Sequence, residues 1–368
     1  MPHEAQRFGD QFTDMHFVVN NEDALRSSKD VLGLRVHSAH FRRCHRIPLH
    51  FAAYFAAFHL TNVFRCIFII CFPKIGGLQA RRPNNMKRIV LIYKRGRSDA
   101  ASLARRMKQW MEGLGLDVMS QQNSAIPDFQ AEIDEPELPA DTDAVVVLGG
   151  DGTFLSVARA VRDRPIPVVG VNLGGLGFLT EIAHESCFSE LGEILEGRYE
   201  IEERMRLQVS LWREGREVFS QTVLNDAVVN KGALARIVNF HTSIDGRYLT
   251  HYRADGIIVA TPTGSTAYNL SAGGPIVYPT AWDVIVTPIC SFTLTNRPII
   301  LPGSARIELT LDDKAQDVAL TCDGQIGRKL LPQDRILITA APAPLRLIKS
   351  PSMDYFDILR TKLKWGTN

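Results

Sequence analysis

The pattern of apolar and polar residues predicts alternating strands and helices from residue 88 onward. Continuous apolar runs at residues 88–93, 143–148 and 166–171 are typical of strands buried on both faces of a parallel sheet. Helical spacing follows the first two runs, beginning at Ser98 in the first case. The apolar face of that first helix contains Leu103, Met107, Trp110, Met111 and Leu114. We therefore expect an α/β domain with a parallel sheet over residues 87–197.

Past about residue 198 the apolar period changes to two, which is typical of half-buried strands. The alternating segments and their turn signals are residues 207–211, 218–223 and 236–244, Glu214-Gly215 and Asp245-Gly246. A mostly β second domain is therefore expected over residues 198–350. Helical spacing returns at residues 354–365, so we expect residues 351–368 to form a C-terminal helix that packs back on the first domain.

The first 86 residues differ in composition from the rest of the chain. They hold seven of the ten histidines and ten of the eighteen phenylalanines. Such a shift marks a boundary, because folded domains seldom change composition so abruptly. We interpret residues 1–86 as an atypical extension, either disordered or upstream of a true start at Met86.

A membrane anchor is the alternative for this extension, because residues 47–72 are strongly apolar. The stretch contains His50, His59, Asn62 and Arg65, however, and each of these is costly in hydrocarbon. A signal peptide fits no better, since the charged region before the apolar run is too long and no small-residue cleavage site follows it. An extension without a membrane role is the favoured interpretation.

Charge and cysteine content exclude several classes of function. The whole chain has a formal net charge of +2, and residues 87–368 alone hold 31 Lys and Arg against 34 Asp and Glu. This balance predicts that no nucleic acid is bound. The six cysteines form no CxxC pair and show no ligand-like spacing with histidine, so a zinc site or a disulfide framework has no support. A reducing compartment is expected.

The sharpest local signal is the strand-to-helix junction GGDGT at residues 149–153. Glycines let backbone amides approach an anion at a helix N-terminus, so the junction predicts a phosphate site. It fits neither the GxGxxG fingerprint, which requires glycine at Leu155, nor the Walker pattern, which requires Lys before Ser or Thr. Asp151 would repel phosphate unless it binds a metal or moves a proton, and a plain turn aspartate is the alternative.

Three further blocks differ in how specific they are when taken singly. Residues 172–179 form a second glycine cluster at the carboxyl end of a predicted strand, where an ordinary glycine turn is the alternative. The run TPTGSTAYNLSAGGP at residues 261–275 offers hydroxyls and the ring of Tyr268, which suit a ribose, an amide or a purine. Its alternative is a surface loop. Asn225-Asp226 is by itself an ordinary turn pair.

In order and spacing these blocks, together with ADG at residues 254–256 and Asp323-Gly324-Gln325, resemble the NAD kinase family. The resemblance spans residues 87–365 and leaves residues 1–86 uncovered. GGDGT alone is shared with lipid kinases and phosphofructokinases, and the later blocks favour NAD kinases. The resemblance implies phosphoryl transfer from ATP, or from inorganic polyphosphate, to the 2′-hydroxyl of the adenosine ribose of NAD, which gives NADP.

The resemblance also implies roles for single residues. Asp151 corresponds to the family's proton acceptor, and Gly152 contacts the dinucleotide beside it. The phosphate loop is completed by Gly149, Gly150 and Thr153. The remaining positions that the family uses to contact NAD are Asn225, Asp226, Arg236, Arg253, Asp255, Thr266, Ala267, Tyr268, Asn269, Leu270, Ser271 and Gln325. No metal-ligating residue is assigned, and Ser291 and Phe292 depart from the Pro and His of many members.

The implied chemistry is physically coherent. A sugar hydroxyl is un-ionised at neutral pH, so transfer requires a carboxylate to take its proton, with Mg²⁺ and amides to spread the phosphate charge. Asp226 and Asp255 can accept hydroxyl and amide hydrogens, and they disfavour a substrate that already carries a 2′-phosphate. Two alternatives stay open: a lipid or sugar kinase that shares the GGDGT loop, and a non-catalytic NAD-binding regulator.

These considerations give a set of expectations about partners and setting. We expect Mg²⁺ as the divalent cofactor, and NAD with ATP or polyphosphate as ligands. We expect no nucleic acid and no membrane as partners. A homo-oligomer in the cytoplasm is the expected state.

Overall fold

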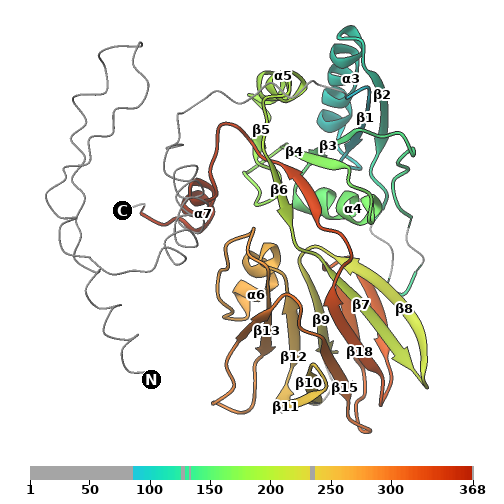
Figure 1. The fold of residues 1–368 in the computed structure, drawn as a ribbon, viewed down its shortest axis with the longest axis vertical. Helices are drawn as coiled ribbons and strands as arrows, with labels where there is room; N and C mark the ends of the chain where they lie inside the picture. The colour runs from blue at the N-terminus through green and yellow to red at the C-terminus, as the bar shows by residue number, and fades with distance from the viewer. Residues whose placement is uncertain (1–85, 126–128, 132–133, 233–236, 367–368) are drawn as a thin grey trace, which may run out of the picture. The chain divides into compact units, whose positions relative to one another are not determined.

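The computed structural model describes residues 86–125, 129–131, 134–232 and 237–366 (Figure 1). All described residues belong to one compact unit, Gln79–Asn368. The interpretation of residues 1–86 therefore lies outside the described residues, except for Met86. In the described part of the chain, no helix combines the length and the apolar character that a membrane span requires.

The first domain is built on a seven-stranded sheet in the order β2-β1-β3-β4-β19-β6, with β5 beside β4 (Figure 1). Its strands are β1 (Arg88–Tyr93), β2 (Asp117–Gln122), β3 (Ala144–Gly149), β4 (Pro167–Asn172), β5 (Ile182–Ala183), β6 (Ile201–Arg204) and β19 (Leu345–Ile348). The neighbouring strands from β2 to β4 are all parallel, which confirms the predicted parallel sheet.

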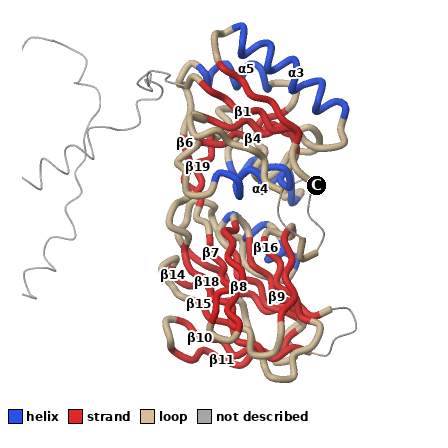
Figure 2. Tube along the Cα trace, turned by 90° about the vertical axis from the view of Figure 1, so that its right-hand side faces the viewer, coloured by secondary structure: helices blue, strands red, loops and turns tan. Residues whose placement is uncertain are grey.

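Helices cover both faces of this sheet (Figure 2). They are α3 (Ser98–Gly113), α4 (Asp151–Val161) and α5 (Cys187–Leu195). Alternate residues of each strand point to opposite faces, so Leu91 packs with α3 and α5 while Val90 packs with α4. In Figure 2, α4 lies between the sheet and the second domain, with the other two helices on the far side of the sheet.

The second domain is an antiparallel sandwich of two six-stranded sheets, in the orders β11-β10-β15-β18-β7-β8 and β14-β13-β12-β9-β16-β17. The first sheet comprises β7 (Leu207–Arg213), β8 (Arg216–Val223), β10 (Val238–Ile244), β11 (Arg247–Ala254), β15 (Ile307–Leu311) and β18 (Arg335–Ala340). The second comprises β9 (Asp226–Lys231), β12 (Gly256–Ala260), β13 (Asp283–Ile289), β14 (Ile299–Pro302), β16 (Val318–Cys322) and β17 (Ile326–Leu330). The inward residues of both sheets form one core, in which Phe240, Val259 and Ile338 are fully buried.

The structure corrects the predicted boundaries of the second domain at residues 198 and 350. Strand β6 and strand β19 belong to the sheet of the first domain, where β19 pairs in parallel with β4 and antiparallel with β6. The chain therefore enters the sandwich after β6 and leaves it before β19. Period-two patterning shows that a segment is a strand but not which sheet it joins, because that depends on distant partners.

Three local expectations are also refined. The helix predicted to follow the GGDGT junction already begins within it, at Asp151, so Asp151 lies in a first helical turn rather than in the preceding loop. The hydroxyl-rich run, expected to be a loop, contains a 3₁₀ helix η2 (Thr263–Thr266) and a short helix α6 (Tyr268–Ser271). Strand β2, which the pattern analysis missed, is an edge strand whose sequence DVMSQQ is mostly polar.

The C-terminal helix α7 (Tyr355–Leu363) begins at a complete capping box. Asp354 accepts hydrogen bonds from the backbone N–H groups of Phe356 and Asp357, and the Asp357 carboxylate accepts one from the Asp354 N–H. The helix contacts both domains, through Tyr278 of the second and Phe178 of the first.

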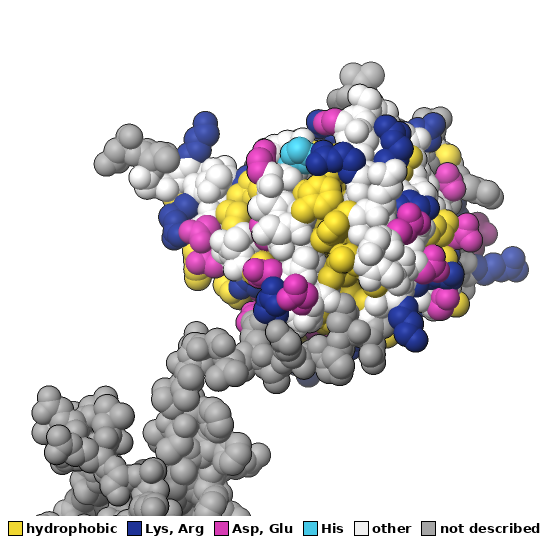
Figure 3. All heavy atoms as spheres, turned by 90° about the horizontal axis from the view of Figure 1, so that it is seen from above, with side chains coloured by type: hydrophobic (Ala, Val, Ile, Leu, Met, Phe, Trp, Pro, Cys, Tyr) yellow, Lys and Arg dark blue, Asp and Glu magenta, His cyan; other side chains and the backbone are white. Residues whose placement is uncertain are grey.

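Viewed from the α3 and α5 end, acidic and basic side chains are interspersed over the surface around a hydrophobic strip (Figure 3).

Candidate active site

The carboxyl ends of β1, β3 and β4 meet at one edge of the parallel sheet, and a pocket of about 230 Å³ opens there. Open α/β sheets place ligands at this edge. The pocket is lined by Gly149, Gly150, Asp151, the second glycine cluster and three basic side chains. A second pocket, of about 440 Å³, is lined by Gly150, Gly152 and Thr153 and shares Lys94 with the first. The predicted phosphate loop thus lies between two cavities.

Asp151 holds the second glycine cluster against the phosphate loop. Its Oδ2 accepts the N–H of Phe178 at 3.0 Å, and its Oδ1 accepts the N–H of Leu179 at 3.1 Å and of Thr180 at 3.3 Å. The Thr180 hydroxyl also lies 3.3 Å from Oδ1. These bonds to backbone amides fix the orientation of the carboxylate. Oδ2 accepts a single bond, so it keeps a lone pair that can take a proton.

The second glycine cluster is shaped by Asn172 at the end of β4. Its side-chain oxygen accepts the Gly174 N–H at 2.6 Å, while its amide nitrogen donates to Gly175 O at 2.8 Å and to the Thr180 hydroxyl at 2.9 Å. These bonds close a tight turn that brings residues 178–180 to Asp151. The two glycine-rich segments therefore form one hydrogen-bonded unit.

Sequence reasoning missed the cations of this pocket, which are Lys94, Arg97 and Lys362. Lys94 directly follows β1 at the carboxyl edge, so the rule that located the glycines could also have found it. Arg97 donates to the Asp99 carboxylate and to Leu173 O at 3.3 Å. Lys362 comes from α7, and only the folded chain brings it there. Among the described residues that line this pocket Asp151 is the one acid, so these side chains give the pocket an excess of positive charge.

A third pocket, of about 330 Å³, lies on the outer face of the second sandwich sheet. It brings together four predicted NAD contacts, Asn225, Asp226, Ala267 and Tyr268. Its floor contains alternate residues of β9, and Tyr268 is 44% exposed, so its ring is available for stacking. The pocket therefore runs along β9, whose outward residues Asp226, Val228 and Asn230 line it.

A buried pair of carboxyl groups lies at one end of this pocket. Asp323 accepts the N–H groups of Leu224, Asn225 and Asp226 at 3.0, 2.7 and 3.2 Å. Burial and, to a smaller extent, the neighbouring Asp323 carboxyl raise the pKa of Asp226 to about 7. Burial also raises the pKa of Asp323, although the three amides oppose the shift. The pair therefore holds a proton at pH values where a free aspartate has lost it.

We expect Asp226→Asn to reduce the loss of stability that accompanies rising pH. The pKa of Asp226 is higher in the folded than in the unfolded chain, so its contribution to stability is fully present below about pH 4 and is lost as pH rises through about 7. The wild type should therefore lose at least about 1 kcal/mol relative to the variant between about pH 5 and 8. Urea unfolding at both pH values measures this difference. Exposed Asp134→Asn is the control, and parallel pH profiles for wild type and Asp226→Asn would contradict the expectation.

Gln325 and Asn269 have their side chains engaged within the protein. Gln325 donates to Gly152 O at 2.7 Å and accepts from buried Arg159 at 2.9 Å, which joins α4 to the turn between β16 and β17. Asn269 is fully buried, donates to Ser265 O and Pro275 O, and accepts the Thr287 hydroxyl at 2.7 Å. In this structure the two residues support the walls of the site.

The remaining described residues that were predicted to contact NAD do not line the third pocket. Asp255 forms an ion pair with Lys231 at 3.2 Å. The next residue, Gly256, pairs with Asn230, so Asp255 lies near the end of β9 that is opposite to Asp226. The Arg253 guanidinium lies 4.7 Å from the centre of the Phe292 ring. Of the predicted contacts in the run at residues 261–275, those outside the pocket lining are Thr266, Asn269, Leu270 and Ser271. Arg236 lies outside the described residues.

The parallel sheet and the cationic, glycine-rich pocket with its carboxylate define the class of the protein as a phosphotransferase. Comparison with known proteins agrees with this class. The family model of the ATP-NAD kinase N-terminal domain matches residues 89–199, and that of the ATP-NAD kinase C-terminal domain matches residues 224–350. The chain belongs to the NAD kinase family.

Individual relatives support the same assignment. An NAD kinase of Syntrophobacter fumaroxidans is 59% identical over 281 residues, covering 76% of this chain and 99% of the relative, and one of Geotalea daltonii is 48% identical over 284 residues with the same coverage. A crystal structure of yeast NADH kinase complexed with NADH has a TM-score of 0.65 at 27% identity, covering 77% of this chain and 89% of that chain. An Archaeoglobus fulgidus NAD kinase in complex with ATP has a TM-score of 0.60 at 25% identity, covering 74% and 99%. Neither a lipid or sugar kinase nor a non-catalytic regulator is favoured.

Proposed function

We propose that this protein transfers the γ-phosphoryl group of ATP to the 2′-hydroxyl of the adenosine ribose of NAD. The new bond joins the ribose O2′ to the γ-phosphorus, the bond from that phosphorus to the β,γ-bridging oxygen breaks, and ADP and NADP are the products. The observation that carries the proposal is the position of Asp151, a carboxylate within a cationic glycine-rich pocket. Asp151 begins helix α4, and Gln325 links this helix to the turn between β16 and β17, which borders the third pocket.

In this proposal Asp151 takes the proton of the 2′-hydroxyl. Its Oδ2 keeps a free lone pair, and its other oxygen is held by amides, so the carboxylate is oriented before substrate binds. Gly149, Gly150 and Thr153 lie where backbone amides at the start of α4 can bind phosphate oxygens.

We place NAD in the third pocket, with Tyr268 as a stacking surface and Asn225 and Asp226 as polar contacts. The Asp226 and Asp323 carboxyl groups give this pocket an acidic end, which disfavours a ligand that carries a 2′-phosphate and so helps NADP to leave. Contacts of NAD with Arg253, Asp255 and the other positions that the family resemblance implies stay predictions.

Magnesium is the metal that we expect with the donor. Within the described residues, no group of three His, Cys, Asp or Glu side chains is placed to hold an ion. Mg²⁺ often keeps several waters and binds through substrate phosphates with one or two carboxylates. Asp151 is the carboxylate in the lining of the glycine-rich phosphate pocket. When bound, the ion would neutralise developing charge on the phosphates. Polyphosphate as an alternative donor, a homo-oligomeric state and a cytoplasmic location also stay predictions.

The test is an assay of the full chain with NAD and Mg²⁺, in which NADP is detected by an NADP-specific dehydrogenase. With ATP present, we expect NADP to form in proportion to ADP. Parallel reactions with polyphosphate, with NADH, and with a diacylglycerol or a hexose phosphate in place of NAD would define the donor and the acceptor. Phosphorylation of the lipid or the sugar without formation of NADP would refute the proposal.

A further inference from the structure

The last helix of the chain reaches the phosphate pocket. Lys362, in the final turn of α7, lines the cavity formed by the two glycine-rich segments. Its Nζ lies 5.8 Å from the centre of the Phe178 ring, and the backbone N–H of Phe178 is bonded to Asp151. An ammonium group over an aromatic face is attracted by the ring, which favours this placement of the side chain.

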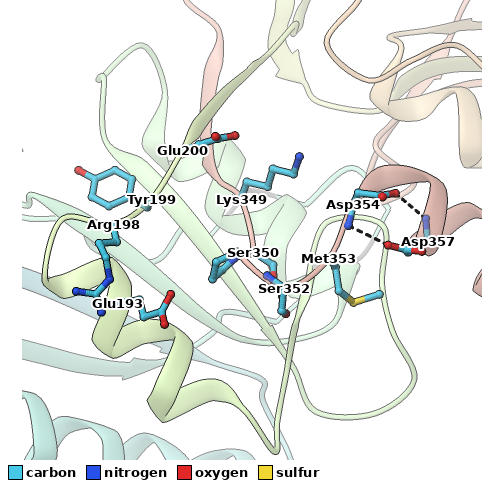
Figure 4. A pocket seen from close by; sticks show the side chains of 11 residues that line it. Glu193, Arg198, Tyr199, Glu200, Lys349, Ser350, Ser352, Met353, Asp354 and Asp357 are labelled. Atoms are coloured by element: carbon cyan, nitrogen blue, oxygen red, sulfur yellow. Dashed lines mark hydrogen bonds between the residues drawn. The ribbon is translucent and has the colours of Figure 1, made fainter. Parts of the chain in front are cut away.

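The start of α7 is fixed to the first domain by buried hydrogen bonds. In the linker after β19, the Ser350 and Ser352 hydroxyls donate to Glu190 at 2.6 and 3.1 Å, and the Ser350 N–H donates to Glu181 at 3.1 Å. A cavity of about 440 Å³ lies at this linker and is lined by both its residues and the end of α5 (Figure 4). Asp354 and Asp357 face each other there across the capping box.

An aromatic contact fixes the same helix to the second domain. The Tyr355 ring packs edge-on against Tyr278 at 5.2 Å between centroids, and Phe356 lies 6.0 Å from Tyr278. Helix α7 is thus held at its first turn by both domains, while its last turn reaches the phosphate loop. A nine-residue helix anchored in this way carries Lys362 to a defined place.

The charge of the pocket indicates what Lys362 binds. In the described part of the chain, Lys94, Arg97 and Lys362 line it and Asp151 is the one acid beside them, so it attracts a strongly anionic ligand. Arg97 is paired with Asp99, which leaves the two lysines as the more available cations. A nucleotide triphosphate carries the negative charge that such a site needs, and lysine ammonium groups bind phosphate as point charges.

We propose that Lys362 binds the phosphates of the donor nucleotide, so that the C-terminal helix completes the donor site. The inference rests on the proposed function and adds to it a residue that determines donor affinity. Because α7 contacts both domains, binding of the donor to Lys362 also ties the phosphate loop to the sandwich that holds NAD.

The test measures ATP binding to the full chain by calorimetry, together with KM values for both substrates. Lys362→Ala should raise the Kd and the KM for ATP about five- to twentyfold, because it removes one charge-assisted contact to phosphate, and should change the KM for NAD less than about twofold. Lys362→Arg should restore most of the affinity for ATP. Lys364→Ala, which removes the same charge next to the end of the same helix, is the matched control and should change the Kd for ATP less than about twofold.

A second variant tests the helix rather than the charge. Tyr355→Ala weakens the contact with Tyr278 and should also raise the KM for ATP, and in the double variant with Lys362→Ala the two effects should not add. An unchanged Kd for ATP in Lys362→Ala, or an equal loss in Lys364→Ala, would overturn the inference. A wild-type protein that binds ATP but forms no NADP would instead refute the proposed function, since calorimetry reports on Lys362 without turnover.

Discussion

Asp151→Asn is expected to lower the turnover of NAD by about 10²- to 10⁴-fold, the usual contribution of a general base. The amide of asparagine keeps the size of the side chain but cannot accept the proton of the ribose hydroxyl. In the proposed arrangement NAD lies in the third pocket, away from Asp151, so its Kd should change less than about tenfold. Steady-state kinetics with saturating ATP, combined with calorimetry for NAD, measures both quantities.

The hydrogen bonds of Asp151 add a structural cost that must be separated from the chemical one. In the variant an NH₂ group would face the N–H of Phe178, because the other oxygen already accepts the amides of Leu179 and Thr180. This conflict should destabilise the fold by about 1–3 kcal/mol. Thr180→Val is the control, since it removes the hydroxyl bonds to the carboxylate and to the Asn172 amide but keeps the base.

Two outcomes distinguish the possible roles of this carboxylate. If Asp151 acts as a metal ligand, added Mg²⁺ or Mn²⁺ should partly restore turnover in Asp151→Asn, whereas a missing base is not rescued by metal. Turnover above about a tenth of the wild-type value would exclude both roles, because that loss lies below the usual contribution of a general base.

Local periodicity was sufficient to predict the framework of the first domain. Leu103, Met107 and Met111 recur at helical spacing and are all buried in α3. The runs that became β1, β3 and β4 are apolar at almost every position, as strands covered on both faces must be. From these strands alone, the glycine-rich segments could be assigned to one edge of the sheet.

Features that depend on distant partners could not be predicted in this way. Strand β19 lies between β4 and β6, although it is separated from both in sequence by the whole sandwich. Asp323 was part of a recognisable motif, yet the three amides that it binds lie about one hundred residues earlier. Lys362 had no local signal at all, because a lysine in the last turn of an exposed helix is common.

The same contrast applies to Asp151. Its place in an anion-binding loop indicated a chemical role, and the family resemblance implied which one. Its bonds to residues 178–180 show that the carboxylate also fixes the shape of the second glycine cluster. A substitution in the second glycine cluster that disturbs these bonds should therefore lower turnover, although the Asp151 side chain itself is unchanged.

Gly177→Ala is expected to lower turnover by at least about 10²-fold, although it leaves Asp151 in place. A Cβ atom at Gly177 would lie 2.2 Å from Asp151 Oδ1 and 2.3 Å from the Thr180 hydroxyl, closer than real Cβ contacts. Either the carboxylate or the backbone of the glycine cluster must shift, and a displacement of about 1 Å at a catalytic group can cost about 10²-fold in rate. The cause is this close approach, because Gly177 does not have the positive φ that favours glycine.

Gly113→Ala provides the matched control, since its new Cβ at the end of α3 would meet no atom within 4 Å. That variant should keep wild-type turnover and unfold at the same or a slightly higher temperature, because alanine favours a helix by about 0.5–1 kcal/mol. Gly177→Ala should be destabilised by about 1–3 kcal/mol. When it is combined with Asp151→Asn, the two losses of turnover should not add, because both act on one carboxylate. Turnover of Gly177→Ala within about threefold of wild type would show that the second glycine cluster does not position Asp151.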